Sequence, residues 1–152
     1  MTQTAQAAQT TQAAQATQPT AHKTAIIDVG GGYRAIFGAG VLDRCLEDGI
    51  TFDSCYGVSA GSANLTSFLA GQHGRNHTFY TQYAFRKEYA STENFLKDRN
   101  FVDLDYVYST LSNHDGENPL DYEAFLGNPA KFTVVACDAR DGSTKYFTRS
   151  DM

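Results

Sequence analysis

Two short glycine-containing motifs hold the residues most capable of chemistry. Gly57-Val58-Ser59-Ala60-Gly61 fits the pattern G-x-S-x-G, and Gly30-Gly31-Gly32 is a run of three glycines. A serine at a sharp strand-to-helix turn exposes its hydroxyl, and small flanking residues let strand and helix approach closely. The N–H groups that begin the following helix favour negative charge near the serine. The pentapeptide alone is a weak signal, because a tight turn with an incidental serine has the same spacing.

The glycine run offers backbone N–H groups that can converge on one small anion. This suits a phosphate at a helix N-terminus or the oxyanion hole of an acyl transfer. A dinucleotide site requires G-x-G-x-x-G and an acidic residue about 20 positions later, at the end of the second strand. Here Ala35 replaces the last glycine, and Asp53 is expected to open the second strand rather than close it. Because that strand leads directly to Ser59, the two motifs fit better as oxyanion hole and nucleophile.

The segments around both motifs alternate between strand and helix patterns. Residues 25–29 and 53–56 are short runs that we expect to form strands. Apolar residues at helical spacing predict one helix over 35–46 and another over 63–69. Strand, helix, strand and helix in short order predict an α/β fold with a mainly parallel sheet.

The later part of the chain follows the same rules. Residues 79–88 and 104–111 are expected to be helical, and the apolar run 132–137 is typical of a central strand. Asp141-Gly142 favours a hairpin turn into a further strand at 146–147. The chain has nine tyrosines, ten phenylalanines and no tryptophan. We interpret these aromatic residues as core, with a lipid-facing surface as the alternative.

Composition narrows the class of protein. A length of 152 residues fits one domain, and no apolar run is long enough to predict a transmembrane segment. A formal net charge of −5 without a basic cluster argues against a nucleic-acid partner. Cys45, Cys55 and Cys137 lack the CxxC spacing of a metal site. We expect all three to be reduced and buried, which favours the cytoplasm.

The N-terminal segment differs from the rest. Residues 1–23 are a low-complexity tract of Thr, Gln and Ala, which we expect to be a disordered tail. The tract lacks the basic cluster and apolar core of a signal peptide, so the cytoplasm remains the predicted location. Folded structure is expected from residue 24 onward.

The two motifs and the helix between them together resemble a known family. Gly30-Gly31-Gly32-Tyr33-Arg34, Gly40-Val41-Leu42 and the serine pentapeptide are similar to the patatin-like phospholipases. The resemblance spans residues 24–152 and is strongest up to Gly71, and Asn64 after the pentapeptide resembles bacterial members. It implies a three-layer α/β/α fold and hydrolysis of lipid acyl esters by a Ser–Asp dyad, without cofactor or metal.

The resemblance also implies roles for individual residues. Ser59 corresponds to the nucleophile, and the N–H groups of Gly30–Gly32 to the oxyanion hole, with Gly30 making the turn. Gly57 and Gly61 flank the serine in the nucleophile elbow, and Arg34 matches a basic position that supports the loop or contacts substrate. The implied partner is a lipid or acyl ester, and a membrane surface is one place where such a substrate is presented.

Two departures from the family pattern qualify these roles. Ala35 stands where the family usually has glycine, and no Asp-Gly-Gly or Asp-Gly-Ala motif supplies the catalytic aspartate. Asp141-Gly142-Ser143 fits a hairpin turn better. We therefore expect the N-terminal part of a patatin-like domain, incomplete at its C-terminus and inactive by itself. The alternative is a non-catalytic protein of this fold that binds a lipid or an anionic group.

The remaining acids and histidines offer no convincing partner for Ser59. Asp28 and Asp138 are interpreted as ordinary strand-end carboxylates. His73 and His77 follow the serine helix too closely to return to its start, and His22 belongs to the tail. His114 precedes any late acidic residue, whereas α/β-hydrolases follow the order Ser, Asp, His.

Overall fold

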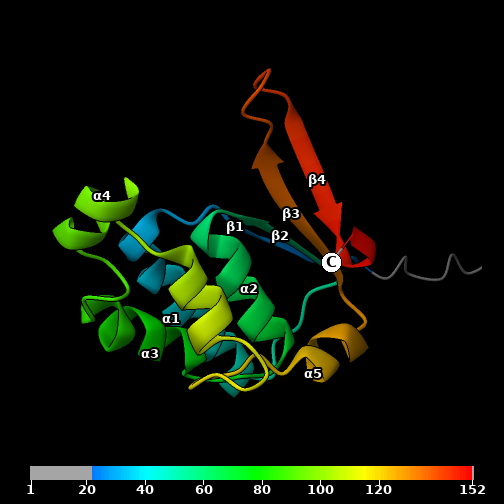
Figure 1. Cartoon of the computed structure of the whole chain (residues 1–152). Coiled ribbons are helices and arrows are strands. Elements are labelled where there is room, and N and C mark those ends of the chain that lie inside the picture. The colour runs from blue at the N-terminus through cyan, green and yellow to red at the C-terminus, as the bar shows by residue number, and fades with distance from the viewer. Residues whose placement is uncertain (1–21, 152) are drawn as a thin grey trace, which may run out of the picture.

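A computed structural model describes residues 22–151, so nearly all of the tail predicted over 1–23 lies outside the described residues. Its strands form one sheet in the order β1-β2-β3-β4. β1 pairs with β2 and β2 with β3 in parallel, whereas β4 is antiparallel to β3. The predicted α/β fold with a mainly parallel sheet is therefore confirmed (Figure 1). The strand bounds are Ala25–Asp28, Ser54–Val58, Lys131–Cys137 and Thr144–Thr148.

The helices lie between and after the first two strands. The two longest are α1 (Ile36–Glu47), which follows the 3-10 turn η1 (Gly32–Ala35), and α2 (Ala60–Leu69). Shorter segments follow: α3 (Arg75–Thr81), η2 (Tyr83–Phe85), α4 (Thr92–Asp98), the π-helical η3 (Tyr106–Leu111), α5 (Tyr122–Gly127) and η4 (Arg149–Asp151).

The main core lies between one face of the sheet and three helices. Alternate strand residues point to the same face, and Cys55 of β2 is paired in register with Phe132 of β3. Both side chains are buried against Leu42 of α1, Leu65 of α2 and Phe125 of α5. This packing fixes the helices on the sheet, and with them the turns that join strands to helices.

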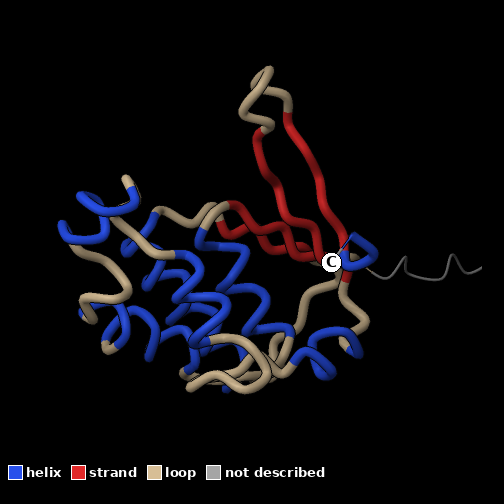
Figure 2. The backbone as a smooth tube through the Cα atoms, in the orientation of Figure 1, coloured by secondary structure: helices blue, strands red, loops and turns tan. Residues whose placement is uncertain are grey.

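The opposite face of the sheet is exposed. Ile27 and Tyr56 are register partners on this face, and they are 66% and 38% exposed. Figures 1 and 2 show the helices of residues 22–151 gathered on the other side of β1 and β2. Of the three layers that were predicted, the described residues therefore supply the sheet and one helical layer.

A second, smaller cluster forms beside the main core. Phe79 of α3 packs edge-on against Tyr83, with ring centroids 5.0 Å apart, and both belong to one buried cluster with Val107 and Leu111 of η3. The predicted helix over 79–88 differs from this arrangement, because α3 begins after Gly74 and ends at Thr81, followed by η2.

The β3–β4 hairpin projects beyond β1 and β2 (Figures 1 and 2). Asp141 lies in its turn, where its Oδ1 accepts a hydrogen bond of 2.8 Å from the Ser143 N–H, as Asp-Gly predicted. Cys45 and Cys55 are buried and free, as expected. The expectation that Cys137 is buried is wrong, because it ends β3 on the exposed hairpin. Within residues 22–151, no helix is both long and apolar enough to cross a bilayer.

Candidate active site

Ser59 occupies the turn between β2 and α2. Its backbone has φ 54° and ψ −132°, in a region that residues other than glycine rarely adopt. The Ser62 N–H donates to the Ser59 carbonyl oxygen over 3.0 Å, which closes the first turn of the helix. Ser59 is exposed. A strained, exposed serine at a strand-to-helix turn has the geometry of a nucleophile elbow.

The flanking glycines allow strand and helix to pack this closely. A Cβ at Gly57 would lie 2.5 Å from the Ser62 Cα, and one at Gly61 would collide with the Asp28 carbonyl oxygen. Any larger residue would therefore push α2 away from β2 or from the end of β1. The G-x-S-x-G pattern thus has a steric reason here.

The glycine loop between β1 and η1 packs directly against this elbow. A Cβ at Gly30 would lie 2.5 Å from the Val58 carbonyl oxygen and 2.9 Å from the N atoms of Ala60 and Gly61. Gly30 also has φ 70°, which favours glycine. Because β1 and β2 are parallel neighbours, the loops after them meet at one edge of the sheet. The structure therefore brings the two motifs together.

The N–H groups of the glycine loop do not all have the same role. The Gly30 N–H donates to Asp28 Oδ1 over 2.9 Å, so it is already engaged within the loop. The predicted oxyanion hole of Gly30, Gly31 and Gly32 is thereby reduced to Gly31 and Gly32 as candidate donors. Gly32 lines the same cavity as Ser59.

Asn64 connects both ends of the glycine loop. Its Nδ2 donates to Asp28 Oδ2 over 2.9 Å and to the Ala35 carbonyl oxygen over 3.0 Å. Its Oδ1 accepts a 3.0 Å hydrogen bond from the Tyr80 hydroxyl. The Asn64 side chain is completely buried, and burial raises the pKa of Tyr80 to about 12, so the phenol stays a donor. One residue of α2 thus holds the loop that borders the serine.

Sequence reasoning missed the part played by Asp28. Its sequence position predicts an ordinary strand-end carboxylate, whereas its two oxygens accept hydrogen bonds from the Gly30 N–H and from Asn64 Nδ2. The available signal was its position, since a carboxylate directly before a glycine loop can accept that loop's N–H groups. The contact with Asn64, 36 residues away, left no local signal.

A cavity of about 470 Å³ lies beside the serine and the glycine loop. Ser59, Gly32 and Ala63 are at its elbow side, and Asn64, Asn76, Arg75 and Ser112 contribute polar groups. Most of the remaining wall is aromatic or aliphatic and comes from η1, α3, η3 and the segments around α4: Tyr33, Phe79, Tyr80, Tyr89, Val102, Leu104, Val107 and Tyr108. Such a wall suits an acyl chain.

Arg34 lies outside this cavity. Its Nε and Cβ are the nearest atoms to a Cβ built on Gly31, at 3.8 and 3.9 Å. It borders a separate, shallow depression together with Phe37 and Val41. Of the two predicted roles, this position favours support of the loop over contact with substrate.

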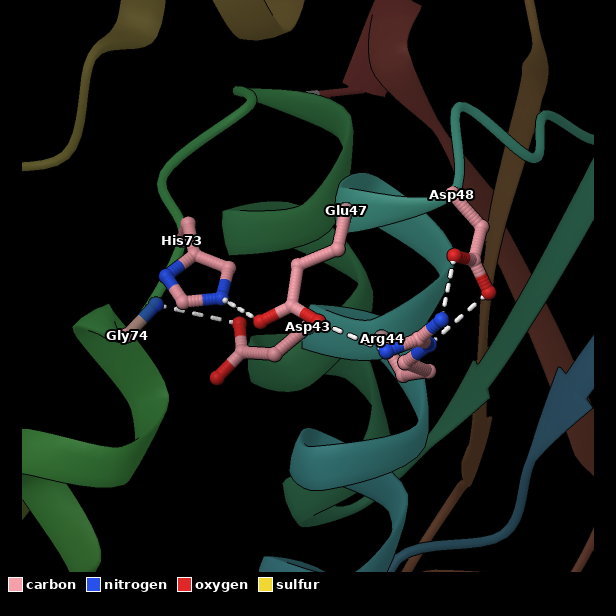
Figure 3. A network of polar contacts seen from close by, with 6 residues as sticks. All are labelled: Asp43, Arg44, Glu47, Asp48, His73 and Gly74. Atoms are coloured by element: carbon pink, nitrogen blue, oxygen red, sulfur yellow. Dashed lines mark hydrogen bonds and ion pairs between the residues drawn. The ribbon is translucent and has the colours of Figure 1, made fainter.

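No acid or histidine of residues 22–151 forms a hydrogen bond with the Ser59 hydroxyl. His73 follows the C-terminal end of α2, where its Nε2 lies 2.9 Å from Glu47 Oε1 (Figure 3). Since α2 has ten residues, it separates His73 from Ser59 by about 15 Å. His77 and His114 are exposed, and among residues 22–151 their side chains make polar contacts with the near neighbours Thr81, Asn113 and Asp115.

Asp53 does not meet the geometry of a dinucleotide site. Its Oδ2 accepts a 2.7 Å hydrogen bond from the Thr24 N–H, which lowers the pKa of the carboxyl group. It precedes β2 and so lies at the opposite edge of the sheet from the glycine loop. No group of three or more His, Cys, Asp or Glu side chains within residues 22–151 gathers as a metal site would require.

Comparison with known proteins identifies the family of the chain. Residues 29–151 match the patatin-like phospholipase family. The chain is 33% identical over 129 residues to the uncharacterized protein YjjU of Escherichia coli (strain K12). That match covers 82% of this chain but 35% of YjjU, so the chain spans about a third of the length of this relative. No solved structure matches significantly. The chain belongs to the patatin-like phospholipase family.

Proposed function

We propose that the protein hydrolyses acyl esters of lipids and that Ser59 is the nucleophile. The observation that supports this most strongly is the position of Ser59, strained and exposed, in one cavity wall with the glycine loop. The family assignment supports the lipid class of substrate.

The reaction follows the usual course of a serine hydrolase. Ser59 Oγ attacks the ester carbonyl carbon and loses its proton to a base, and the carbonyl oxygen becomes an oxyanion. The N–H groups of Gly31, Gly32 and Ala60, the residue after the nucleophile, stabilise that charge. The alcohol then leaves with a proton, and water hydrolyses the acyl-enzyme to release the fatty acid and restore Ser59.

The proposed base lies outside residues 1–152. The family resemblance implies an aspartate, and the described residues place no carboxylate on the Ser59 hydroxyl. The full-length protein would supply this group near the elbow. No step of the proposal requires a cofactor or a metal.

We propose that the protein reaches its substrate at a membrane surface. α4 belongs to a segment whose ends, Tyr89 and Val102, line the cavity. On this segment Phe95 and Leu96 are 51% and 81% exposed. Exposed apolar side chains beside a cavity can enter a lipid interface. We also propose a cytoplasmic location, which the free thiols of Cys45 and Cys55 support.

A second candidate is a non-catalytic protein that binds a lipid or an anionic group in the same cavity. The absence of a base for Ser59 within residues 22–151 favours it. Both candidates predict ligand binding, but only the first predicts turnover that depends on Ser59.

Ester hydrolysis by the full-length protein separates the two candidates. We expect Ser59→Ala to abolish hydrolysis of p-nitrophenyl esters while the unfolding transition is retained. Ser62→Ala is the matched control, since its hydroxyl is also on the first turn of α2 but is buried without a partner among the described residues. Equal activity of Ser59→Ala and wild type would refute the assignment.

A further inference from the structure

Arg75, the first residue of α3, brings a positive charge to the wall of the cavity that Ser59 also lines. Its guanidinium carbon lies 4.7 Å from the centroid of the Phe79 ring, which belongs to the same wall. Most of the surrounding wall is apolar or aromatic, so this group differs in kind from its neighbours.

Neutral groups hold the guanidinium in place. Nη1 donates to Ser67 Oγ over 2.9 Å, and Nη2 donates to Ser112 Oγ and the Asn118 carbonyl oxygen, each over 3.0 Å. A guanidinium has five N–H groups, so two remain without an acceptor among the described residues. One of these is the buried Nε of Arg75. The three bonds fix the orientation of the charge without neutralising it.

Arg75 forms no ion pair with a carboxylate of residues 22–151. Arg86, which packs on the neighbouring Tyr83, shows the contrast, since it binds both oxygens of Glu117 at 2.5 and 2.7 Å. Accordingly, Glu117 raises the pKa of Arg86, whereas burial lowers the pKa of Arg75. A charge withdrawn from water without a counterion costs free energy, and a ligand anion would offset that cost.

We propose that Arg75 binds the anionic group, a phosphate or a carboxylate, of an amphiphilic ligand whose apolar part fills the cavity. The proposal names a substrate class for the proposed active site, and its relevance to catalysis rests on the proposed function of Ser59. The preferred substrate is then an acyl ester that itself carries a negative charge. Arg75 stays protonated throughout and takes no part in bond making or breaking.

Binding of ten-carbon ligands to the full-length protein tests this without turnover. Calorimetric titration compares decyl phosphate, decanoate and decanol, which share a chain and differ in head group. We expect at least one anion to bind ten times more tightly than decanol or better, because charge-assisted hydrogen bonds are the strong ones. The anion that binds more tightly shows whether Arg75 prefers a phosphate or a carboxylate group.

Variants locate the effect. Arg75→Gln should reduce the preference for the anion about tenfold or more and leave the affinity for decanol unchanged. Arg99→Gln, which removes an exposed arginine at the end of α4, should change neither affinity. Ser59→Ala should keep the anion preference, which separates Arg75 from an oxyanion hole that captures carboxylate. Equal affinities for decanol and both anions, or an unchanged preference in Arg75→Gln, would overturn the proposal.

Nuclear magnetic resonance of the wild-type protein decides the case if Arg75→Gln does not fold. The Nε–H resonance of Arg75, assigned from its loss in Arg75→Lys, should shift on addition of decyl phosphate and not of decanol. Absence of that shift contradicts the proposal. Neither measurement depends on catalysis, so failure of anion binding leaves Ser59 as nucleophile, and failure of Ser59 leaves Arg75 as an anion site.

Discussion

At the scale of single residues, the elbow depends on conformations that cost free energy. The backbone of Ser59 at φ 54° is of the kind that costs about 1–3 kcal/mol and persists where the surroundings hold it. Here the surroundings are closely packed backbone segments, and they can approach because Gly30, Gly57 and Gly61 have no Cβ, for which there would be too little space. Strain of this kind concentrates at sites of function, in agreement with the proposed role of Ser59.

Gly32 and Gly49 allow backbone strain to be separated from catalysis. They have φ 59° and 67°, and a Cβ on either would meet no atom within 4 Å. Alanine at either position should cost about the same stability, on the order of 1 kcal/mol. Only Gly32→Ala should lower kcat, with little change in KM. Loss of one oxyanion-hole donor lowers kcat by about 100-fold, and we expect the effect of Gly32→Ala to approach that value. A change in KM alone would instead make the loop a binding element.

Tyr80 should make stability depend on alkaline pH. An unfolded tyrosine has a pKa of about 10, and burial raises that of folded Tyr80 to about 12. Between these values the unfolded chain loses the proton that the folded state retains, so stability falls as pH rises. Urea unfolding from pH 8 to 11 should show a smaller fall for Tyr80→Phe, whereas the exposed control Tyr146→Phe should behave as wild type.

At the scale of elements, α2 has two roles, because its start carries the serine and its first full turns carry Asn64. Through Asp28 and Ala35, Asn64 ties the helix to the glycine loop. One helix thereby fixes the positions of both the proposed nucleophile and the proposed oxyanion donors. Catalysis by such donors requires that they be placed before charge develops.

Asn64→Leu should disturb the loop without a large change in volume. We expect kcat to fall about tenfold or more, and stability to fall by about 1–3 kcal/mol because Asp28 loses a buried donor. Tyr80→Phe removes a single bond to Asn64 and should have a smaller effect on kcat. The exposed Asn113→Leu serves as control. A fall in stability with unchanged kcat would show that Asn64 supports the fold but not the loop's function.

The segment around α4 should matter for substrate in a membrane. Leu96→Asp adds a charge to an exposed apolar position on the segment whose ends line the cavity. It should lower hydrolysis of esters in vesicles several-fold and leave hydrolysis of short soluble esters unchanged, because only the former requires an interface. Ile50→Asp, at an exposed position after α1, should affect neither. Equal losses on both substrates would point to damage of the cavity.

Local pattern predicted some of these elements well and others not at all. The strand–loop–helix units that carry both motifs appear near their expected bounds, because their apolar periodicity is regular. α4 and α5 have seven and six residues, too few for a clear period. Each of these helices begins at an N-cap side chain, because Ser91 and Asp121 accept hydrogen bonds from the backbone N–H groups three residues later.

The site likewise contains some contacts that the sequence predicts and others that it does not. The meeting of glycine loop and elbow followed from parallel neighbouring strands, which place successive loops at one edge. Other contacts of the site join residues that are far apart in the chain. Asn64 donates a hydrogen bond to Asp28, and Arg75, which has no carboxylate partner among residues 22–151, donates one to the Asn118 carbonyl oxygen. No spacing or composition signal indicates such contacts before the fold is known.

At the scale of the whole molecule, the described residues cover one face of the sheet with helices and leave the other face exposed. Ile27 and Tyr56 leave one face of the sheet exposed, and the β3–β4 hairpin projects beyond the other strands (Figure 1). The chain also spans only 35% of its relative YjjU. These facts agree with the proposal that the base for Ser59 comes from outside residues 1–152.

The most direct test is the site at which a fluorophosphonate probe reacts. Peptide mass spectrometry of the labelled full-length protein should find the phosphonate on Ser59, and Ser59→Ala should remain unlabelled. Residues 1–152 alone should react slowly or not at all, because residues 22–151 place no base on the hydroxyl. Labelling at another residue, or equal labelling of wild type and Ser59→Ala, would contradict the account.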